Sequence, residues 1–324
     1  MHCVTPMTQS FNVLRESRVL GGLASAALLE PYRPLLVHLV VTRRCNLSCG
    51  YCTEYDATSP PVPLALLRQR IDCLQRLRAV IVALTGGESL LHPDAVALVS
   101  TIRAQGMTAA LNTNGLLLTR ELIHALNAAG LYALQLSVDS VTGNAVTKKS
   151  LKPLLPKLRL LAEHAKFRVR VNTVLGAAPP EEALEVVRTA AGFGFDAKCS
   201  LLRRADGTLA PLEPRAREIY AEISKLEGRS LGLLNEKFQD GLIEAGTVAW
   251  KCRAGARFFH VCEDGLVHLC APRWKSPGTP LADYTQDHLR RAFHARKPCA
   301  VGCPIAYAHN VSQLDALRSQ DGTP

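Results

Sequence analysis

Aromatic side chains are scarce in this chain of 324 residues, where Phe, Trp and Tyr together make up 5%. Leu, Val and Ala supply most of the hydrophobic 48%, a composition typical of buried parallel strands and the helices that cover them. The chain also lacks any extended run of Lys or Arg and any recognisable nucleic-acid module. We therefore interpret the net charge of +10 as a solvated basic surface and expect no nucleic-acid partner.

No apolar stretch is long enough to span a membrane. Residues 19–29 form an apolar run after two arginines, which crudely mimics a signal peptide, but the run lies between the acidic residues Glu16 and Glu30. We expect an N-terminal extension over 1–34 that contains an amphipathic or buried helix. The sequence thus favours a cytoplasmic protein with no membrane partner.

Cysteine is abundant and clustered, with 11 residues. A secreted disulfide scaffold would be short and dense in cysteine, so clusters in a chain of this length indicate metal binding instead. Cys73 and Cys199 stand apart from the clusters within apolar patterns, and we expect them to pack as small core residues.

Six short apolar runs alternate with five amphipathic stretches between residues 35 and 203. The predicted strands are 35–41, 80–84, 108–112, 133–138, 168–174 and 197–202, and the predicted helices are 64–78, 94–105, 119–129, 151–165 and 181–193. This alternation indicates α/β architecture with a parallel sheet. Periodicity alone leaves open a doubly wound sheet or a partial barrel, and in both a ligand binds beyond the C-terminal strand ends.

The remaining chain divides into a linker at 204–250, with a charged helix near 214–227, and a cysteine-rich part at 251–324. Asp264-Gly265 between two apolar runs predicts a hairpin of 258–262 with 266–270. A two-residue turn would place Cys262 opposite Val267, three rungs or about 10 Å from Cys270.

Three cysteines, Cys45, Cys49 and Cys52, follow the first predicted strand with the spacing Cys-x3-Cys-x2-Cys. Three thiolates on one loop can hold three irons of a 4Fe–4S cubane and leave the fourth iron open, as a catalytic metal requires. A structural zinc or a redox thiol pair is the alternative, but zinc would need a fourth ligand nearby, and none follows at a suitable spacing.

With Tyr51 before its last cysteine, this triplet resembles the signature of the radical S-adenosylmethionine (SAM) superfamily. The resemblance implies a partial (β/α)6 TIM-like barrel over 35–203, in which Cys45, Cys49 and Cys52 carry the catalytic cluster. It further implies that SAM chelates the open iron and is cleaved by one electron. The product, a 5′-deoxyadenosyl radical, abstracts hydrogen from an unactivated C–H bond.

Gly86-Gly87-Glu88 stands at the end of the second predicted strand, about forty residues after the triplet. Glycines let backbone approach a ligand closely, and a carboxylate can accept hydrogen bonds from an ammonium group. In the family, the matching Gly-Gly-Glu contacts the methionine amine of SAM, although Ser89 stands here where many members have proline.

Three further polar residues lie at later predicted strand ends. Ser137 and Asp139 share one face at period two, and Asn172 is on the fifth strand. The resemblance implies contacts with the ribose or methionine parts of SAM. Ordinary strand-end capping is the alternative.

A second set of cysteines comprises Cys252, Cys270, Cys299 and Cys303, with twelve residues between Cys252 and Gly265. This pattern resembles the twitch (half-SPASM) module, and the resemblance implies a small α+β domain whose four cysteines hold an auxiliary 4Fe–4S cluster. A zinc site with the same four ligands is the alternative. The predicted hairpin leaves Cys262 outside this set.

The resemblance covers about 35–203 and 250–304. It implies an oxidoreductase or maturase that oxidises or cross-links a small molecule or peptide, served by an electron donor such as flavodoxin or ferredoxin. The segment before the first strand is too short for a winged-helix domain that grips a leader peptide, which makes peptide modification less expected. A radical SAM methyltransferase and a non-catalytic two-cluster electron carrier remain as alternatives, although a carrier would not need Gly-Gly-Glu.

Overall fold

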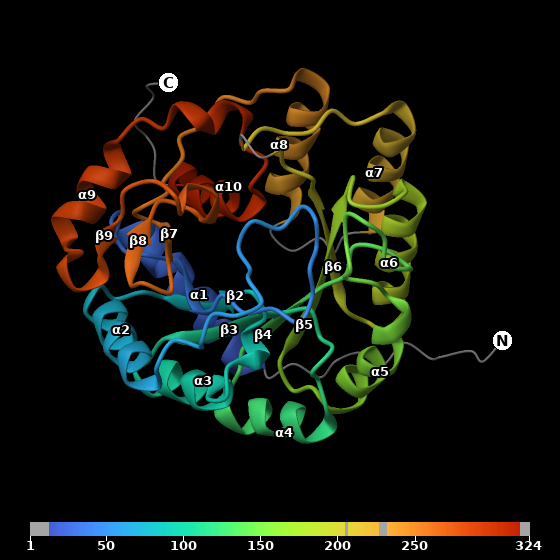
Figure 1. Ribbon diagram of the computed structural model, residues 1–324. Helices are drawn as coiled ribbons and strands as arrows, with labels where there is room; N and C mark the ends of the chain where they lie inside the picture. Colours follow the sequence, from blue (N-terminus) through green and yellow to red (C-terminus); the bar gives the residue numbers. More distant parts are fainter. Residues whose placement is uncertain (1–12, 205–206, 227–231, 318–324) are drawn as a thin grey trace.

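The computed structural model describes residues 13–204, 207–226 and 232–317. Its centre is a nine-stranded sheet with the order β6-β5-β4-β3-β2-β1-β7-β8-β9 (Figure 1). The strands are β1 (Leu36–Thr42), β2 (Ile81–Gly86), β3 (Thr108–Thr113), β4 (Ala133–Ser137), β5 (Arg168–Leu175), β6 (Asp196–Leu201), β7 (Phe258–Val261), β8 (Leu266–His268) and β9 (Thr279–Pro280). Strands β1 to β6 are parallel and adjacent in chain order, as the sequence predicts.

This strand order decides between the two architectures that periodicity leaves open. A doubly wound sheet reverses its order at a switch point, whereas consecutive parallel strands with right-handed crossovers place all the helices on one face. Figure 1 accordingly shows α2 to α6 around the outside of a curved, open sheet. These helices are α2 (Leu64–Arg76), α3 (Ala95–Ala104), α4 (Arg120–Ala129), α5 (Leu155–His164) and α6 (Pro180–Gly192). The fold is the expected α/β partial barrel.

The strand register places a layer of small side chains on the inner face of this barrel. His38 pairs with Ala83, and the same row continues through Ala110 and Ala133. Because side chains alternate between faces, Thr85, Asn112 and Gln135, two positions further along β2, β3 and β4, point to the same side and are polar, whereas Val40 on β1 is apolar. The barrel interior therefore opens into a polar site above an alanine layer.

The cysteine-rich segment continues the same sheet. Strand β7 pairs in parallel with β1, and β8 and β9 follow in antiparallel order. Four more helices complete the described C-terminal part: α7 (Pro214–Leu226), α8 (Gly232–Ala245), α9 (Gln286–His294) and α10 (Ala306–Gln313). Helix α8 lies in the stretch expected to be a linker.

The predicted hairpin forms, but its register differs by one residue from the expectation. Val261 pairs with Val267, and the amide of Cys262 donates to the carbonyl of Leu266 at 3.0 Å. Gly265 adopts a φ of +87°, which makes a three-residue loop with a bulge instead of a two-residue turn. Cys262 consequently lies opposite Leu266 and not Val267.

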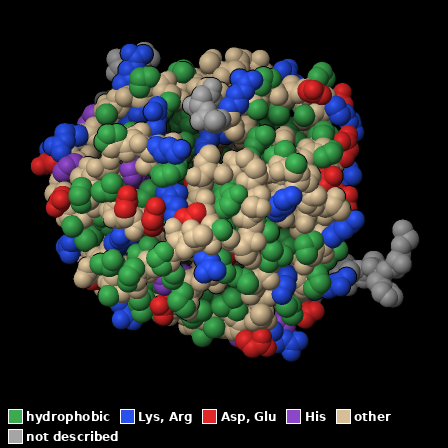
Figure 2. Space-filling view, viewed as in Figure 1, with side chains coloured by type: hydrophobic (Ala, Val, Ile, Leu, Met, Phe, Trp, Pro, Cys, Tyr) green, Lys and Arg blue, Asp and Glu red, His purple; other side chains and the backbone are tan. Residues whose placement is uncertain are grey.

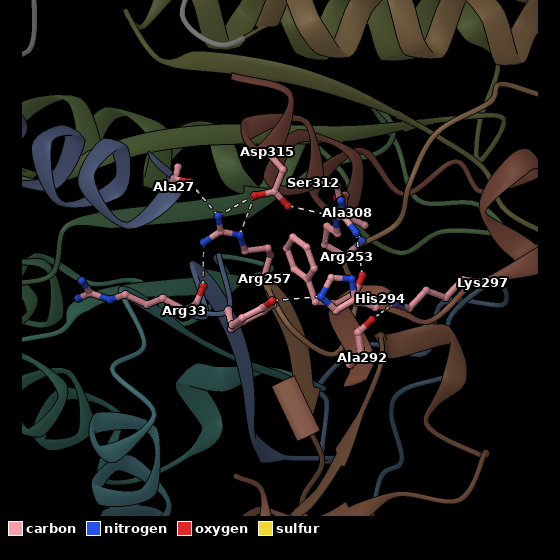
Figure 3. A network of polar contacts seen from close by, with 12 residues as sticks. Ala27, Arg33, Arg253, Arg257, Ala292, His294, Lys297, Ala308, Ser312 and Asp315 are labelled. Carbon is pink, nitrogen blue, oxygen red and sulfur yellow. Dashed lines mark hydrogen bonds and ion pairs between the residues drawn. The ribbon is translucent and has the colours of Figure 1, made fainter. Parts of the chain in front are cut away.

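A buried arginine joins the two ends of the described chain (Figure 3). The fully buried Arg257 donates to Asp315 at 2.9 and 2.6 Å. It also donates to the carbonyls of Ala26 and Ala27 near the end of α1 (Val13–Leu29), at 3.0 and 2.9 Å. Because a helix leaves its last carbonyls without intrahelical partners, Arg257 caps α1 while its charge is balanced by Asp315.

Lys and Arg side chains are dispersed over the face in Figure 2, among acidic and apolar side chains, with no single continuous basic patch on that face. In the part of the chain that the structure describes, no helix combines the length and apolar character needed to cross a membrane.

Candidate functional site

A cavity of about 230 Å³ lies at the C-terminal ends of the barrel strands. The structure brings seven of the predicted site residues into its wall: Cys45, Cys49, Tyr51, Cys52, Gly86, Gly87 and Ser137. The first four come from the loop after β1, and the others come from the ends of β2 and β4. Three thiols and two strand ends that are far apart in sequence thus surround one space.

The cysteine loop is held by its own backbone. The amide of Cys45 donates to the carbonyl of Asp56 at 3.0 Å, and the amide of Cys52 donates to Cys49 at 3.1 Å. Two sulfurs already accept backbone hydrogen bonds, Cys45 Sγ from Leu47 at 3.4 Å and Cys49 Sγ from Lys148 at 3.2 Å. Amide donors of this kind stabilise cluster thiolates, so the loop fits a 4Fe–4S cubane.

Gly86 and Gly87 allow the end of β2 to touch the cysteine loop. A Cβ on Gly87 would lie 2.3 Å from the carbonyl oxygen of Arg43, and one on Gly86 would lie 2.0 Å from that of Thr42. Gly86 also has a φ of +137°, which L side chains rarely adopt. The glycines are therefore needed for contact between two protein segments, in addition to the expected approach of a ligand.

Glu88 lies behind the cavity and not in its wall. Its carboxylate is 1% exposed and accepts from the Thr113 hydroxyl at 2.6 Å and from the amides of Asn114 and Leu90 at 2.7 and 3.0 Å. Burial raises the pKa of Glu88, while these hydrogen bonds oppose the rise. In this arrangement the carboxylate fixes the end of β3, and the backbone at Thr85, Gly86 and Gly87 is what faces the cavity.

A polar network connects the cysteine loop with the end of β4. The Tyr51 hydroxyl donates to Asp139 at 2.7 Å and accepts from Lys149 Nζ at 2.8 Å, and the Thr147 hydroxyl donates to Asp139 at 2.8 Å. Burial raises the pKa of Tyr51. Burial alone would lower the pKa of Lys149, but Tyr51 and Asp139 outweigh it and raise that pKa. Asp139 does not line the cavity itself, but its hydrogen bond with Tyr51 connects it to the cavity wall.

Asn172 is a predicted SAM-contacting residue that lies outside the cavity wall. Its Oδ1 accepts a hydrogen bond from the Ser200 hydroxyl at 2.8 Å, and this bond joins β5 to β6. Sequence reasoning did not single out Lys149, which stands in a loop without a recognisable motif. A basic residue twelve positions after the end of β4 carries no local signal of function.

The four C-terminal cysteines, Cys252, Cys270, Cys299 and Cys303, also come together. Burial and, to a smaller extent, the proximity of the other thiols raise the pKa of Cys270 to about 12 and that of Cys303 to about 11. Cys303, Cys252 and Cys299 all act electrostatically on Cys270, so the four thiols lie near one another.

Cys262 is separate from this set. The charged groups that act on it are Arg43, Glu263, Asp264 and Glu54, and none of them is a cysteine. Of the isolated cysteines, Cys199 is 1% exposed within the main core, as predicted, and Cys73 packs against it.

Comparison with known proteins now identifies the family. Residues 39–202 match the model of the Radical SAM superfamily, and the chain belongs to it. The chain is therefore an enzyme of a family that uses a 4Fe–4S cluster and SAM.

Two curated relatives illustrate its range. A GTP 3',8-cyclase of Parasynechococcus marenigrum is 30% identical over 254 residues, 71% of this chain and 67% of the relative. A PqqA peptide cyclase of Gluconobacter oxydans is 34% identical over 115 residues, 35% of this chain and 32% of the relative. This chain spans about two thirds of the length of the GTP 3',8-cyclases that it matches.

Among solved structures, SuiB of Streptococcus suis bound to its precursor peptide SuiA aligns with a TM-score of 0.63. The alignment covers 95% of this chain and 78% of SuiB at 12% identity. At this identity the likeness establishes the fold alone, which extends beyond the barrel into the C-terminal part.

Proposed function

We propose that this enzyme is an oxidoreductase or maturase that oxidises or cross-links a small molecule or a peptide. The observation that supports this most strongly is the convergence of Cys45, Cys49 and Cys52 with the Gly86-Gly87 backbone on one cavity. When bound there, the cluster and SAM would supply one-electron bond cleavage and a radical that abstracts hydrogen.

The chain's own residues would hold and orient these groups. The three thiolates grip the cluster, and the amides of Leu47 and Lys148 stabilise the sulfurs of Cys45 and Cys49. The strand-end backbone at Gly86 and Gly87 faces the methionine part of SAM. Tyr51, held between Asp139 and Lys149, fixes the loop relative to β4.

The four C-terminal cysteines would hold the auxiliary 4Fe–4S cluster. Their mutual proximity supports a shared metal centre. A net oxidation needs an acceptor for the electron that the substrate radical loses, and an auxiliary cluster would supply one.

Peptide and small-molecule substrates both have support. The relatives include a PqqA peptide cyclase and GTP 3',8-cyclases, and the similar SuiB structure contains a precursor peptide. An external electron donor such as flavodoxin or ferredoxin completes the proposal.

The test is anaerobic reconstitution followed by iron and sulfide counts and a SAM cleavage assay with dithionite. We expect about eight irons per chain and formation of 5′-deoxyadenosine. Cys49→Ala should lose about four irons and all cleavage, whereas Cys303→Ala should lose four irons and keep cleavage. Cys73→Ala, at a cysteine outside both sets, is the matched control.

Other outcomes point to the alternatives. Cleavage with only four irons in the unaltered protein would refute the auxiliary cluster. Full iron without cleavage, in the presence of candidate substrates, would favour the electron carrier. Methylated product together with S-adenosylhomocysteine would identify a methyltransferase.

A further inference from the structure

Cys262 is a buried thiol that neither cysteine set uses. It is 1% exposed and stands directly after β7, on the same face of the hairpin as His260. His260 pairs across the hairpin with His268, so the imidazole of His268 lies on this face as well. The one-residue shift of the hairpin register is what brings the thiol and this imidazole to the same side.

Three potential metal ligands meet at this position. Ligand atoms of Cys262, Asp264 and His268 all lie within 4.8 Å of one another. Asp264 belongs to the turn, where its Oδ1 accepts from the amide of Leu266 at 2.9 Å and leaves the other carboxylate oxygen available. Tetrahedral zinc holds its ligand atoms roughly 3 to 4 Å apart, so small side-chain movements suffice to close the site.

His268 supplies independent evidence for a ligand. The residue is 4% exposed, and within the described chain neither of its ring nitrogens has a hydrogen-bond partner. A buried imidazole without partners costs free energy, because it loses its hydrogen bonds to water and gains none from protein. A metal ion bound to one ring nitrogen would remove much of this cost.

The local charges are compatible with a divalent cation. Arg43 lies 3.6 Å from Cys262 Sγ, but its guanidinium is paired with Glu263 at 2.7 Å. A thiolate and a carboxylate would neutralise a charge of +2, and the neutral imidazole adds none. Binding would release the thiol proton to solvent.

We propose that Cys262, Asp264 and His268 bind one divalent metal ion of the zinc type. Sulfur, nitrogen and oxygen donors together suit a borderline-soft ion, whereas calcium and magnesium prefer oxygen alone. Three protein ligands leave a fourth position free. His268 also borders a cavity of about 420 Å³ lined by residues of β8, β9 and α9.

Zinc, iron and sulfide should be counted together in the reconstituted full chain, after dialysis against zinc and then against zinc-free buffer. We expect about one zinc per chain in addition to the iron. Zinc K-edge absorption should show one sulfur neighbour with nitrogen and oxygen neighbours. Cys262→Ser and His268→Gln should each lower bound zinc at least fivefold at unchanged iron, and Cys73→Ser should leave zinc unchanged.

The proposal is wrong if the unaltered protein retains no zinc after dialysis. It is also wrong if Cys262→Ser and His268→Gln retain as much zinc as the unaltered protein. A zinc edge with four sulfur neighbours, lost in Cys303→Ser, would overturn it also, because the ion would then occupy the four-cysteine set. Asp264→Asn, in an exposed turn, provides the same test if Cys262→Ser does not fold. These readouts involve no SAM cleavage, so they are independent of the proposed reaction.

Discussion

The Tyr51 hydroxyl and the Asp139 carboxylate, 88 positions apart in sequence, are joined by a hydrogen bond of 2.7 Å. Lys149 donates to the same hydroxyl at 2.8 Å, so Tyr51 stands between a buried carboxylate and a buried ammonium group. The residue before the third cysteine therefore ties the cysteine loop to the opposite side of the cavity.

Tyr51→Phe should weaken this tie without removing a cluster ligand. Loss of the hydroxyl leaves Asp139 and Lys149 each without one buried partner, which should cost about 1–3 kcal/mol in the free energy of unfolding. SAM affinity should fall about tenfold, which corresponds to roughly 1.4 kcal/mol, at unchanged iron content. Urea unfolding and equilibrium dialysis with SAM measure both effects. Tyr32→Phe, at a hydroxyl bonded to His294, is the control, and equal SAM binding by both variants would contradict the role of Tyr51.

Gly87→Ala should disrupt the catalytic cluster site by direct collision. The new Cβ would lie 2.3 and 2.4 Å from the carbonyl oxygens of Arg43 and Arg44, so the loop that begins at Cys45 must move. We expect most of the four catalytic irons to be lost in iron analysis, with the auxiliary irons retained. Gly192→Ala, where nothing lies within 4 Å of the new Cβ, should keep all the iron. Normal iron in Gly87→Ala would show that the loop can shift freely.

Acid should destabilise the cofactor-free chain through His260. Burial first, and then the neighbouring groups His38, Arg43 and His268, lower the pKa of His260 to about 3. Below pH 6.5 the unfolded chain binds a proton that the folded chain excludes, so stability falls as pH decreases from 6.5 toward 3. The loss between pH 7.5 and 5 should be about 2 kcal/mol from this residue. Urea unfolding of His260→Leu should show a correspondingly smaller loss, and an identical pH dependence would refute the assignment.

The buried pair of Arg257 and Asp315 should be sensitive to single substitutions. Asp315→Ala leaves an uncompensated buried charge, which should lower the free energy of unfolding by about 3–5 kcal/mol. The exposed pair of Arg215 and Glu181 gives the matched control, because solvent screens it and Glu181→Ala should leave the free energy of unfolding almost unchanged. Thermal or urea unfolding measures both, and similar losses for the two would contradict a special role for the buried pair.

Local sequence patterns predicted the strands and helices of the barrel well because their causes are local, whereas the choice of a barrel over a doubly wound sheet rested on the family resemblance. A buried parallel strand is a continuous apolar run, and the run predicted at 108–112 is the strand Thr108–Thr113. The hairpin register failed because Asp-Gly suits both a two-residue turn and a bulged three-residue loop, and neighbouring strands decide between them. Linker helices were expected over 204–250, but the bounds of α8 could not be read from a stretch that contains glycine at both Gly232 and Gly241.

The candidate site could be predicted only where a motif marks it. The cysteine spacing located the thiols, but the long-range contacts around them were not readable from local sequence. Nothing near Gly87 shows that its neighbour is the carbonyl of Arg43, and nothing near Lys149 indicates its hydrogen bond to Tyr51. The expected contact of Glu88 with SAM rests on the family resemblance, and only the structure shows that its carboxylate also accepts hydrogen bonds from Thr113 and Asn114.

The pairing of β1 with β7 also has a consequence for synthesis of the chain. Leu36 and Phe258 are neighbours in the sheet, so one edge of the first strand stays unpaired until more than 220 further residues have been made. An open strand edge invites pairing with other chains. While the chain is still on the ribosome, the unpaired edge of β1 is therefore open to pairing with strands of other chains. A delay in translation between β6 and β7 should raise aggregation more than an equal delay after β9.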